Sequence, residues 1–433
     1  MADSRKKTIL ASLVVPVFFS GIFAGFSPCK EEQPPAATLE FWGVFDDSDI
    51  WQPIIRQFSQ QYPYITINYH KKNITTYESE LVDALAAGRG PDIFMLNNSW
   101  LPKHKDKLAA APETLISASK FNEIFVDVAS ADFIDGGKIY GWPLAVDTLA
   151  LFYNKDLFNN AGVAQPPETW GEFNEAVTKL TRKDESGNIK QAGAAIGTAR
   201  NVNRSTDILS ALMLQSGAKM VADDKKSAAF NLSVTLSSGE SFNPGEQALS
   251  YYSSFANPQK KVYTWNDLQH YSLDSFVEGQ AAMMFNYAYQ ISVLRVRSPH
   301  LNFGVAPLPQ ISDTGKKITL ANYWGQVVAK TSVNQTHAWT FLAWLIQPEN
   351  LKTYLAATGK PTSRRDLVSW QQNDQDLGIF ATQALTGKSW WQADNNQVEK
   401  ILADAVDSAV SGSQTVREAI DEAVKKVTLL MKD

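Results

Sequence analysis

Two kinds of side chain recur at or near the ends of predicted strands in this 433-residue chain: aromatic rings, and groups that form hydrogen bonds. The hydrogen-bonding candidates are Asp46, Asp47, Asn97, Asn98, Asp147, Arg200 and Asn286. The aromatic candidates are Trp42, Trp100, Tyr287, Tyr289, Trp324, Trp390 and Trp391. A sugar offers an apolar face to aromatic rings and a rim of hydroxyls to charged acceptors. The candidates therefore offer both kinds of contact that a sugar would need, with a plain core role as the alternative for each tryptophan.

Residue patterns for bond-breaking chemistry are missing from the sequence. The five histidines are scattered: His70, His104, His270, His300 and His337. None of them has H-E-x-x-H or Cys/His metal-ligand spacing, and the chain contains neither G-x-S-x-G nor a P-loop, so we expect no metal and no cofactor. The aspartates of residues 46–49 and Asp147 could form a carboxylate pair for glycoside hydrolysis. Helix capping and binding of sugar hydroxyls explain them more simply, so we expect a binding protein and not an enzyme.

Charge and length narrow the class of protein further. The formal net charge is −5, the lysines and arginines are scattered, and the sequence indicates no nucleic-acid partner. At roughly 100–200 residues per domain, a chain of this length contains two or three domains, each able to bury a core. The 12 tryptophans are numerous enough to leave some for a binding surface.

Alternating strands and helices position the N-terminal candidates. Strands are expected at 39–44, 65–70 and 91–96, with a helix between each pair. Thr75 and Glu78 are expected to form a capping box for the second helix. Such alternation predicts a mostly parallel sheet, in which ligands bind beyond the carboxyl ends of the strands. Residues 42–47 and 97–100 should therefore lie on one rim.

Further elements are expected along the rest of the chain. Strands are predicted at 194–198, 281–287 and 303–309. Helices are predicted at 208–214, 246–255, 271–279, 336–347, 398–410 and 416–430. A helix with a Thr169–Glu172 capping box should follow Pro167, and Thr415–Glu418 should cap the last helix.

The stretch Tyr140–Phe158 contains a carboxylate in an apolar run. Leu144–Tyr153 is almost continuously apolar and predicts a strand buried on both faces. A carboxylate inside such a run is unfavourable unless a partner compensates it. Asp147 is therefore either exposed where the strand leaves one sheet, or placed in a cleft facing a ligand.

This stretch resembles the first inter-lobe crossing of extracellular solute-binding proteins of family 1, the maltose-binding-protein-like receptors of carbohydrate ABC transporters. The pattern Y-G-x-P-x-x-x-[DE]-x-x-x-L-x-Y-N-K-D-L is matched by Tyr140, Gly141, Pro143, Asp147, Leu151, Tyr153, Asn154, Lys155, Asp156 and Leu157. Further family motifs match at Gly88–Ile93, 167–173, Phe276–Met283 and Ala338–Arg364. The resemblance covers about residues 38–430.

The resemblance implies an α/β fold of the two-lobe periplasmic-binding-protein kind (Venus flytrap, type II) with three inter-lobe crossings. It places residues 39–146 and 285–325 in lobe 1, and residues 147–284 and 326–433 in lobe 2. It implies a monomeric receptor that captures a sugar or oligosaccharide between the lobes and delivers it to an ABC transporter permease. Asp147, Tyr289 and Trp324 lie in segments that match crossing or cleft motifs. The alternatives are a carbohydrate-active enzyme, or a receptor for a non-sugar solute such as a polyamine.

The N-terminal 29 residues have the composition of an export segment. A basic start at residues 5–7 precedes the apolar run Ile9–Phe26 and Cys29, the only cysteine. Cys29 is either the lipidation site of a lipoprotein or a bystander beside an uncleaved membrane anchor, because Pro28 departs from the usual lipobox. Residues 30–38 are expected to be a tether. Both readings put the body outside the cytoplasmic membrane, at the cell surface or in the periplasm.

Replacing Cys29 separates the two kinds of anchor. If Cys29 carries the lipid, Cys29→Ala protein is still exported but leaves the membrane fraction, because no other group holds it there. Cell fractionation followed by immunoblotting measures this. A variant that stays in the membrane fraction would identify Ile9–Phe26 as the anchor and overturn the lipoprotein interpretation.

Overall fold

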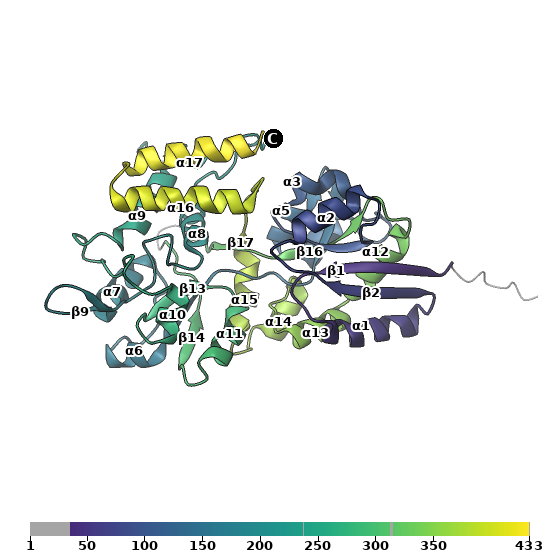
Figure 1. Cartoon of the computed structure of the whole chain (residues 1–433), viewed down its shortest axis with the longest axis horizontal. Helices are drawn as coiled ribbons and strands as arrows, with labels where there is room; N and C mark the ends of the chain where they lie inside the picture. Colours follow the sequence, from purple (N-terminus) through teal and green to yellow (C-terminus); the bar gives the residue numbers. More distant parts are fainter. Residues whose placement is uncertain (1–34, 237, 312–314, 433) are drawn as a thin grey trace, which may run out of the picture. The chain divides into compact units, whose positions relative to one another are not determined.

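The computed structural model describes residues 35–236, 238–311 and 315–432 (Figure 1). Residues 36–433 form one compact unit. Cys29, the apolar segment at 9–26 and the first part of the expected tether lie outside the described residues. Within the described ranges, no helix is both long and apolar enough to cross a membrane.

Two separate hydrophobic cores divide this unit into two lobes. The core of lobe 1 draws its buried residues from 39–146 and 321–367, with Ala384 added. The core of lobe 2 draws its buried residues from 149–320 and 380–427. The chain therefore passes between the cores three times, at 146–149, at 320–321 and between 367 and 380. Figure 1 shows the result: the later helices α12 (Gln335–Leu345) and α13 (Pro348–Thr358) lie beside the N-terminal strands.

These divisions differ from the boundaries expected from sequence. Residues 285–320 belong to the second core, and residues 326–367 belong to the first. The reason is strand pairing: β13 (Met283–Asn286) pairs antiparallel with β8 (Ala150–Asn154), so it completes the sheet of lobe 2 and does not return to lobe 1.

Lobe 1 is built on a six-stranded sheet in the order β2-β1-β3-β16-β4, with β7 also paired to β16. Its strands are β1 (Ala37–Gly43), β2 (Ile65–Lys71), β3 (Ile93–Asn97), β4 (Leu108–Ala109), β7 (Gly141–Pro143) and β16 (Trp324–Ala329). The first three run parallel, as alternation with helices predicts, whereas β16 runs antiparallel to β3. Its main early helices are α1 (Ser48–Gln61), α2 (Tyr77–Ala86), α3 (Leu101–His104), α4 (Ala118–Ile124) and α5 (Asp127–Phe133).

The predicted capping box at the start of the second helix is wrong. Helix α2 begins at Tyr77, and its N-cap residue Thr76 makes no side-chain cap bond. The Thr75 hydroxyl donates to Asn73 instead, at 2.8 Å. The Glu78 carboxylate does not bind back to the start of the helix, because it forms a hydrogen bond with His104.

The apolar run at 144–153 is not one strand. A crossing segment at 144–149, which follows β7, is succeeded by β8. Isolated bridges hold the crossing segment, one from Ala145 to Thr362 and one from Thr148 to Ala321. The sequence shows the same apolar residues for a strand and for a crossing buried between two lobes, so periodicity could not separate them.

Lobe 2 is built on the antiparallel sheet β13-β8-β14, with β14 spanning Phe303–Ala306. Around it lie α6 (Lys155–Asn160), α7 (Trp170–Leu180), α8 (Ser205–Gln215), α9 (Pro244–Ser254), α10 (Ser272–Val277), α11 (Gln290–Arg297), α15 (Gly378–Gln383), α16 (Asn395–Ser411) and α17 (Val416–Leu430). The last two lie side by side (Figure 1). The capping boxes at Thr169 and Thr415 are both confirmed.

The strand expected at 194–198 does not form. This segment joins the sheet of lobe 2 only through single bonds, such as the one from the Ala195 amide to the Met283 carbonyl at 2.9 Å. The left-handed glycine Gly197, with φ +118°, breaks the extended backbone that a strand requires.

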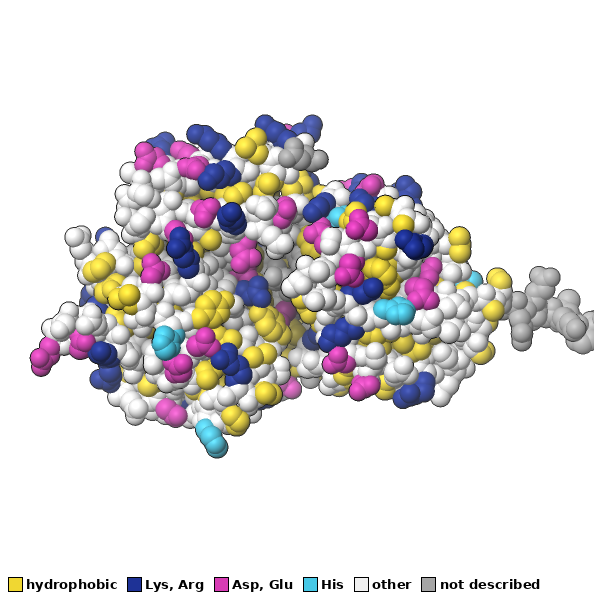
Figure 2. Space-filling view, in the orientation of Figure 1, with side chains coloured by type: hydrophobic (Ala, Val, Ile, Leu, Met, Phe, Trp, Pro, Cys, Tyr) yellow, Lys and Arg dark blue, Asp and Glu magenta, His cyan; other side chains and the backbone are white. Residues whose placement is uncertain are grey.

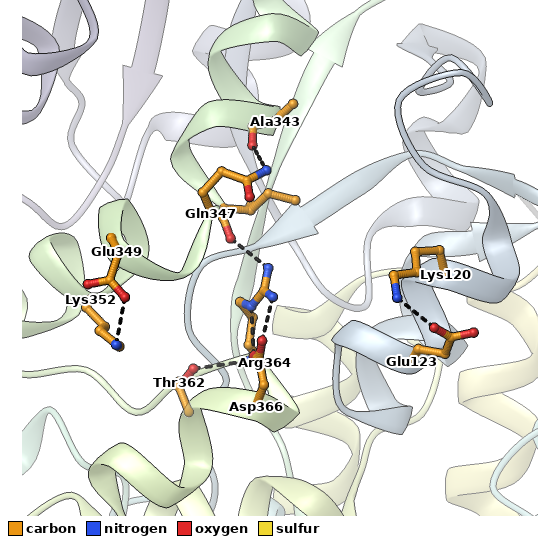
Figure 3. Close-up of polar contacts among 10 residues, drawn as sticks. Lys120, Glu123, Ala343, Gln347, Glu349, Lys352, Thr362, Arg364 and Asp366 are labelled. Carbon is orange, nitrogen blue, oxygen red and sulfur yellow. Dashed lines mark hydrogen bonds and ion pairs between the residues drawn. The ribbon is translucent and has the colours of Figure 1, made fainter. Parts of the chain in front are cut away.

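A buried arginine holds the segment that pairs with the first crossing. Arg364 donates through Nη1 to the Ile346 carbonyl at 2.8 Å and through Nε and Nη2 to the Asp366 carboxylate at 2.9 and 2.7 Å (Figure 3). The side chain is buried, so each donor needs these partners. Two residues earlier, Thr362 forms its bridge to the crossing residue Ala145. Arg364 therefore stabilises the segment that pairs with the first crossing.

Removing the guanidinium of Arg364 should destabilise the fold. Arg364→Met keeps most of the stem but leaves the buried Ile346 carbonyl without its charged donor, so we expect a loss of about 1.5–3 kcal/mol of unfolding free energy, measured by urea denaturation. Lys120→Met is the matched control, because Lys120 forms an exposed pair with Glu123 (Figure 3) that contributes little. Equal midpoints for the two variants would contradict this role of Arg364.

Candidate ligand-binding site

A cavity of about 1550 Å³ lies between the two lobes, and residues of both lobes line it. Figure 2 shows the surface hollowed between the lobes, with acidic and basic side chains near the opening. The volume exceeds the roughly 300–1,000 Å³ of sites for drug-sized ligands. The cavity therefore has room for an extended ligand.

An aromatic cluster forms the lobe 1 side of the cavity. The ring of Trp324 meets the edges of Phe45 at 5.4 Å and Trp100 at 5.1 Å between centroids. Phe45 follows β1 and Trp100 follows β3, at the carboxyl ends of these parallel strands. Because β16 is antiparallel, Trp324 at its beginning reaches the same edge of the sheet. The Phe45 side chain remains 44% exposed, so apolar surface faces the cavity.

Two asparagines at the exit of β3 line the same wall but use part of their hydrogen-bonding capacity internally. Asn97 Oδ1 accepts from the Ser99 amide at 3.1 Å. Asn98 Nδ2 donates to Asp132 at 2.9 Å, and its Oδ1 accepts from the Tyr323 amide at 3.3 Å. These bonds fix the loop after β3, which leads to Trp100.

Asp147 lies where the first crossing enters lobe 2. Its Oδ1 accepts from the backbone amides of Thr148 at 2.8 Å and Ala288 at 3.0 Å. Burial raises the pKa of this carboxyl to about 7, although the backbone N–H donors and the positive charge of Arg204 favour the charged form. Asp147 is thus a cavity-lining acceptor whose charge changes near neutral pH.

Two tyrosines form the lobe 2 side. The rings of Tyr287 and Tyr289 are stacked, with centroids 6.4 Å apart and planes at 18°. Tyr287 is buried and donates to Asp207 Oδ2 at 2.9 Å, whereas Tyr289 is 46% exposed. Arg204 donates to the Tyr289 hydroxyl at 2.7 Å. Tyr289 therefore faces the cavity with its back supported by a second ring.

A buried ion pair closes the lobe 1 wall near the last crossing. Lys360 Nζ lies 2.5 Å from Asp46 Oδ1 and 2.9 Å from the Tyr354 hydroxyl. Burial lowers the pKa of Lys360, and the attraction of Asp46 acts against this shift. The ammonium is thereby neutralised by the protein itself.

Hydrogen bonds also join the lobes across the cavity rim. Asn395, at the start of α16 in lobe 2, accepts from Trp100 Nε1 at 2.6 Å and from Ser99 Oγ at 3.0 Å. Ser389 donates to Asp132 Oδ1 at 2.5 Å. Closure of the lobes is thus supported by polar contacts around the cavity.

The charges on the lining residues are mostly acidic. The acidic residues are Glu78, Asp147, Asp207, Asp374, Asp376 and Glu399, and the basic residues are Arg204, Arg295 and Lys360. Each basic side chain has a carboxylate partner, at 3.8 Å for Arg204, 2.6 Å for Arg295 and 2.5 Å for Lys360. Among the described residues, no cluster of His, Cys, Asp and Glu could hold a metal ion.

The structure brings eight of the predicted ligand-binding residues to the cavity: Asn97, Asn98, Trp100, Asp147, Tyr287, Tyr289, Trp324 and Trp390. Six others do not line it: Trp42, Asp46, Asp47, Arg200, Asn286 and Trp391. Asp46 is one layer behind the wall, where it binds Lys360.

Of the other five, Trp42, Asp47, Arg200 and Asn286 have partners elsewhere. Lys72 lies over the Trp42 ring at 3.7 Å, and Asp47 pairs with Lys71 at 2.7 Å. Arg200 is 82% exposed and pairs with Asp407 at 2.9 Å. Asn286 is fully buried, with its amide directed to Asn203 at 3.0 Å. Trp391 follows the cavity residue Trp390 but does not itself line the cavity.

Sequence reasoning missed several lining residues. The group includes Phe45, Arg204, Asp207, Asn322, Lys360 and Asn395. Phe45 could have been found, because it directly follows the first predicted strand on the expected rim. Arg204 and Lys360 carried no local signal, since both reach the cavity only through contacts with distant segments.

Comparison with known proteins assigns the family. Residues 43–352 match the family described as bacterial extracellular solute-binding protein. The chain belongs to this family. The family consists of extracellular solute-binding proteins. A binding protein of Brucella abortus (strain 2308) is 22% identical to this solute-binding protein over 396 residues, which is 88% of this chain and 90% of the relative.

Other relatives share the fold. The maltotriose-binding protein of Pyrococcus abyssi is 25% identical over 313 residues, covering 71% of this chain and 62% of the relative. The cyclic alpha-maltosyl-1,6-maltose binding protein from Arthrobacter globiformis superposes with a TM-score of 0.75 at 20% identity, over 92% of this chain and 99% of that one. The sugar-binding protein MalE of Xanthomonas citri superposes with a TM-score of 0.74 at 21% identity, over 92% of this chain and 98% of that one. The expected two-lobe, type II binding-protein fold is confirmed.

The raised pKa of Asp147 predicts how stability depends on pH. The folded state holds the Asp147 proton more tightly than the unfolded state, whose pKa is near 3.8, so this contribution is complete below about pH 4 and is lost as the pH rises to about 7. The Asp147→Asn protein should therefore be more stable than wild type above pH 7, by roughly 2–4 kcal/mol, and equal to it near pH 4. Urea midpoints across this range measure the difference.

The exposed Asp47 provides the control for this experiment. Asp47→Asn removes the same charge from an aspartate outside the cavity, so it controls for the loss of one negative charge. A constant difference between Asp147→Asn and wild type at all pH values would show that Asp147 does not titrate in this way.

Proposed function

We propose that this solute-binding protein captures a sugar or oligosaccharide in the cavity between its lobes and delivers it to an ABC transporter permease. The observation that carries the proposal is the pairing of aromatic surfaces on both walls with acceptors between them. Trp324 presents the surface of lobe 1, Tyr289 presents that of lobe 2, and Asp147 lies at the crossing. Sugar rings stack their C–H faces on such rings and donate hydroxyl protons to such acceptors.

The charge of the cavity supports a neutral ligand over an anionic one. Each basic side chain among the described lining residues already has a carboxylate partner, so none of these three cations is free for a phosphate or sugar acid. A polyamine is the alternative that the acidic lining and the aromatic walls also permit, because ammonium groups are attracted to carboxylates and to aromatic faces. Binding without turnover distinguishes a receptor from a carbohydrate-active enzyme.

The setting of this receptor follows from the same proposal. It acts as a monomer held at the membrane by its N-terminal segment, through a lipid on Cys29 or through residues 9–26. Its partners are the saccharide and the transmembrane subunits of the permease, and it needs no cofactor. The type II fold supports this setting, because its two lobes can close on a solute and present it outside the membrane.

A thermal-shift screen tests the proposal directly. Residues 30–433 are titrated with maltotriose, mannobiose, an arabino-oligosaccharide, spermidine and sn-glycerol 3-phosphate. A ligand at about 100 times its Kd stabilises the native state by about 2.7 kcal/mol, so a saccharide should raise Tm. The saccharide is then recovered and analysed by chromatography, and we expect it intact. A shift with spermidine alone, or hydrolysis of the saccharide, would overturn the proposal.

Truncation of Trp324 should weaken binding more than folding. Trp324→Ala removes the ring that joins Phe45 and Trp100 at the cavity wall, and we expect affinity for the best saccharide to fall by about 10- to 100-fold. Isothermal titration calorimetry measures the loss. Trp42→Ala is the matched control, because Trp42 is partly exposed but lies outside the cavity. The Trp42→Ala protein should bind the saccharide with the affinity of wild type.

Ligand should also bring the lobes together. Rotation at the crossings 146–149 and 320–321 and at the third crossing between 367 and 380 would reduce the radius of gyration, as in other hinged pairs of lobes. Small-angle X-ray scattering with and without saturating saccharide measures the change. An unchanged radius would contradict hinge closure but not binding.

A further inference from the structure

Arg204 has an unusual backbone conformation for its position. It precedes α8 with φ 62° and ψ 23°, in the left-handed region that L-residues other than glycine rarely adopt. Among the described residues, Lys225 is the only other non-glycine residue with positive φ. Arg204 makes no side-chain cap bond to the helix it precedes, so helix capping does not explain it. Strain that persists in a well-packed structure points to a function for the side chain.

The side chain of Arg204 connects both tyrosines of the cavity wall. Its Nη2 donates to the Tyr289 hydroxyl at 2.7 Å, and its Nη1 lies 3.8 Å from Asp207 Oδ2. The same Asp207 oxygen accepts from the Tyr287 hydroxyl at 2.9 Å. The guanidinium carbon lies 5.4 Å from the centre of the Tyr287 ring and 5.7 Å from that of Tyr289. One planar fork thus fixes two rings, which the point charge of a lysine cannot do.

Fixing Tyr289 matters because this ring is half exposed to the cavity. A free tyrosine there would lose rotamer freedom on stacking against a ligand, and that loss would weaken binding. The hydrogen bond from Arg204 and the ring of Tyr287 remove this freedom in advance. Asp207 balances the positive charge, so Arg204 orders the platform without making the wall cationic.

We propose that Arg204 is a positioning residue that holds Tyr289 as a preformed stacking platform for a sugar ring, and that its left-handed backbone is kept for this contact. The inference rests on the proposed function, because it assigns a role within the same saccharide site. Under this inference Arg204, which lies outside the matched crossing motifs, contributes to the affinity for the saccharide.

Glycine at position 204 separates this role from a structural one. Glycine adopts the left-handed conformation without strain, so Arg204→Gly relieves the backbone strain at this position and also removes the guanidinium. We expect Tm to stay within about 3 °C of wild type. Affinity for the saccharide with the largest shift among maltotriose, mannobiose and the arabino-oligosaccharide should fall by about tenfold. Arg204→Lys should restore less than half of the loss in binding free energy, because its single ammonium cannot hold both partners.

Two further variants make the test specific. Lys225→Gly relieves the same kind of backbone strain at an exposed residue that does not line the cavity. The affinity of this variant for the saccharide should be unchanged. Tyr289→Phe keeps the ring but removes the hydroxyl that Arg204 binds. If Arg204 acts through Tyr289, the Arg204→Gly, Tyr289→Phe double variant should bind no more weakly than the weaker single variant.

The outcomes distinguish the two proposals. If wild type binds none of the three saccharides, the proposed function fails and this inference falls with it. If wild type binds one of them but Arg204→Gly binds it equally well, only the role of Arg204 is wrong. Additive effects of Arg204→Gly and Tyr289→Phe on affinity would also overturn it, because the two residues would then act independently.

Discussion

The geometry of the site depends on the hydrogen bonds that surround one carboxylate at the junction of the lobes. Asp147 accepts from the Ala288 amide through its side chain, and its carbonyl accepts from the Asn322 amide at 3.0 Å. A single residue thereby ties the first crossing to the exit of β13 and to the second crossing. Because a carboxylate in an apolar surrounding is unfavourable without donors, the exit of β13 must stay beside the first crossing, and the backbone bond from Asn322 adds the second crossing. The cavity walls are attached to them.

Each wall follows from the sheet beneath it. In lobe 1 the carboxyl ends of two parallel strands and the beginning of an antiparallel one bring Phe45, Trp100 and Trp324 together. In lobe 2 the exit of β13 places Tyr287 and Tyr289 against the start of α8. Strands therefore present the aromatic surfaces, whereas short segments outside the long helices and strands form the crossings between the lobes. This arrangement suits a receptor that must move its walls without deforming them.

Several charged and amide side chains of the cavity are already paired with other protein groups. Arg204, Arg295 and Lys360 each have an acidic partner, and Asn97 and Asn98 bind their own loop. Such prior pairing lowers the cost of ordering side chains on binding.

The sequence alone determined the family motifs, the alternation that builds the first sheet and the caps at Thr169 and Thr415, because these depend on local spacing. It also identified Asp147, Tyr289 and Trp324, which lie in those motifs and line the cavity. Tertiary structure decided the rest. The lobe boundary at 285–320 depends on which strand β13 pairs with, and Arg204 reaches Tyr289 across 85 positions of sequence. Pairing and contact at that separation are set by packing of the whole lobe, and no local pattern records them.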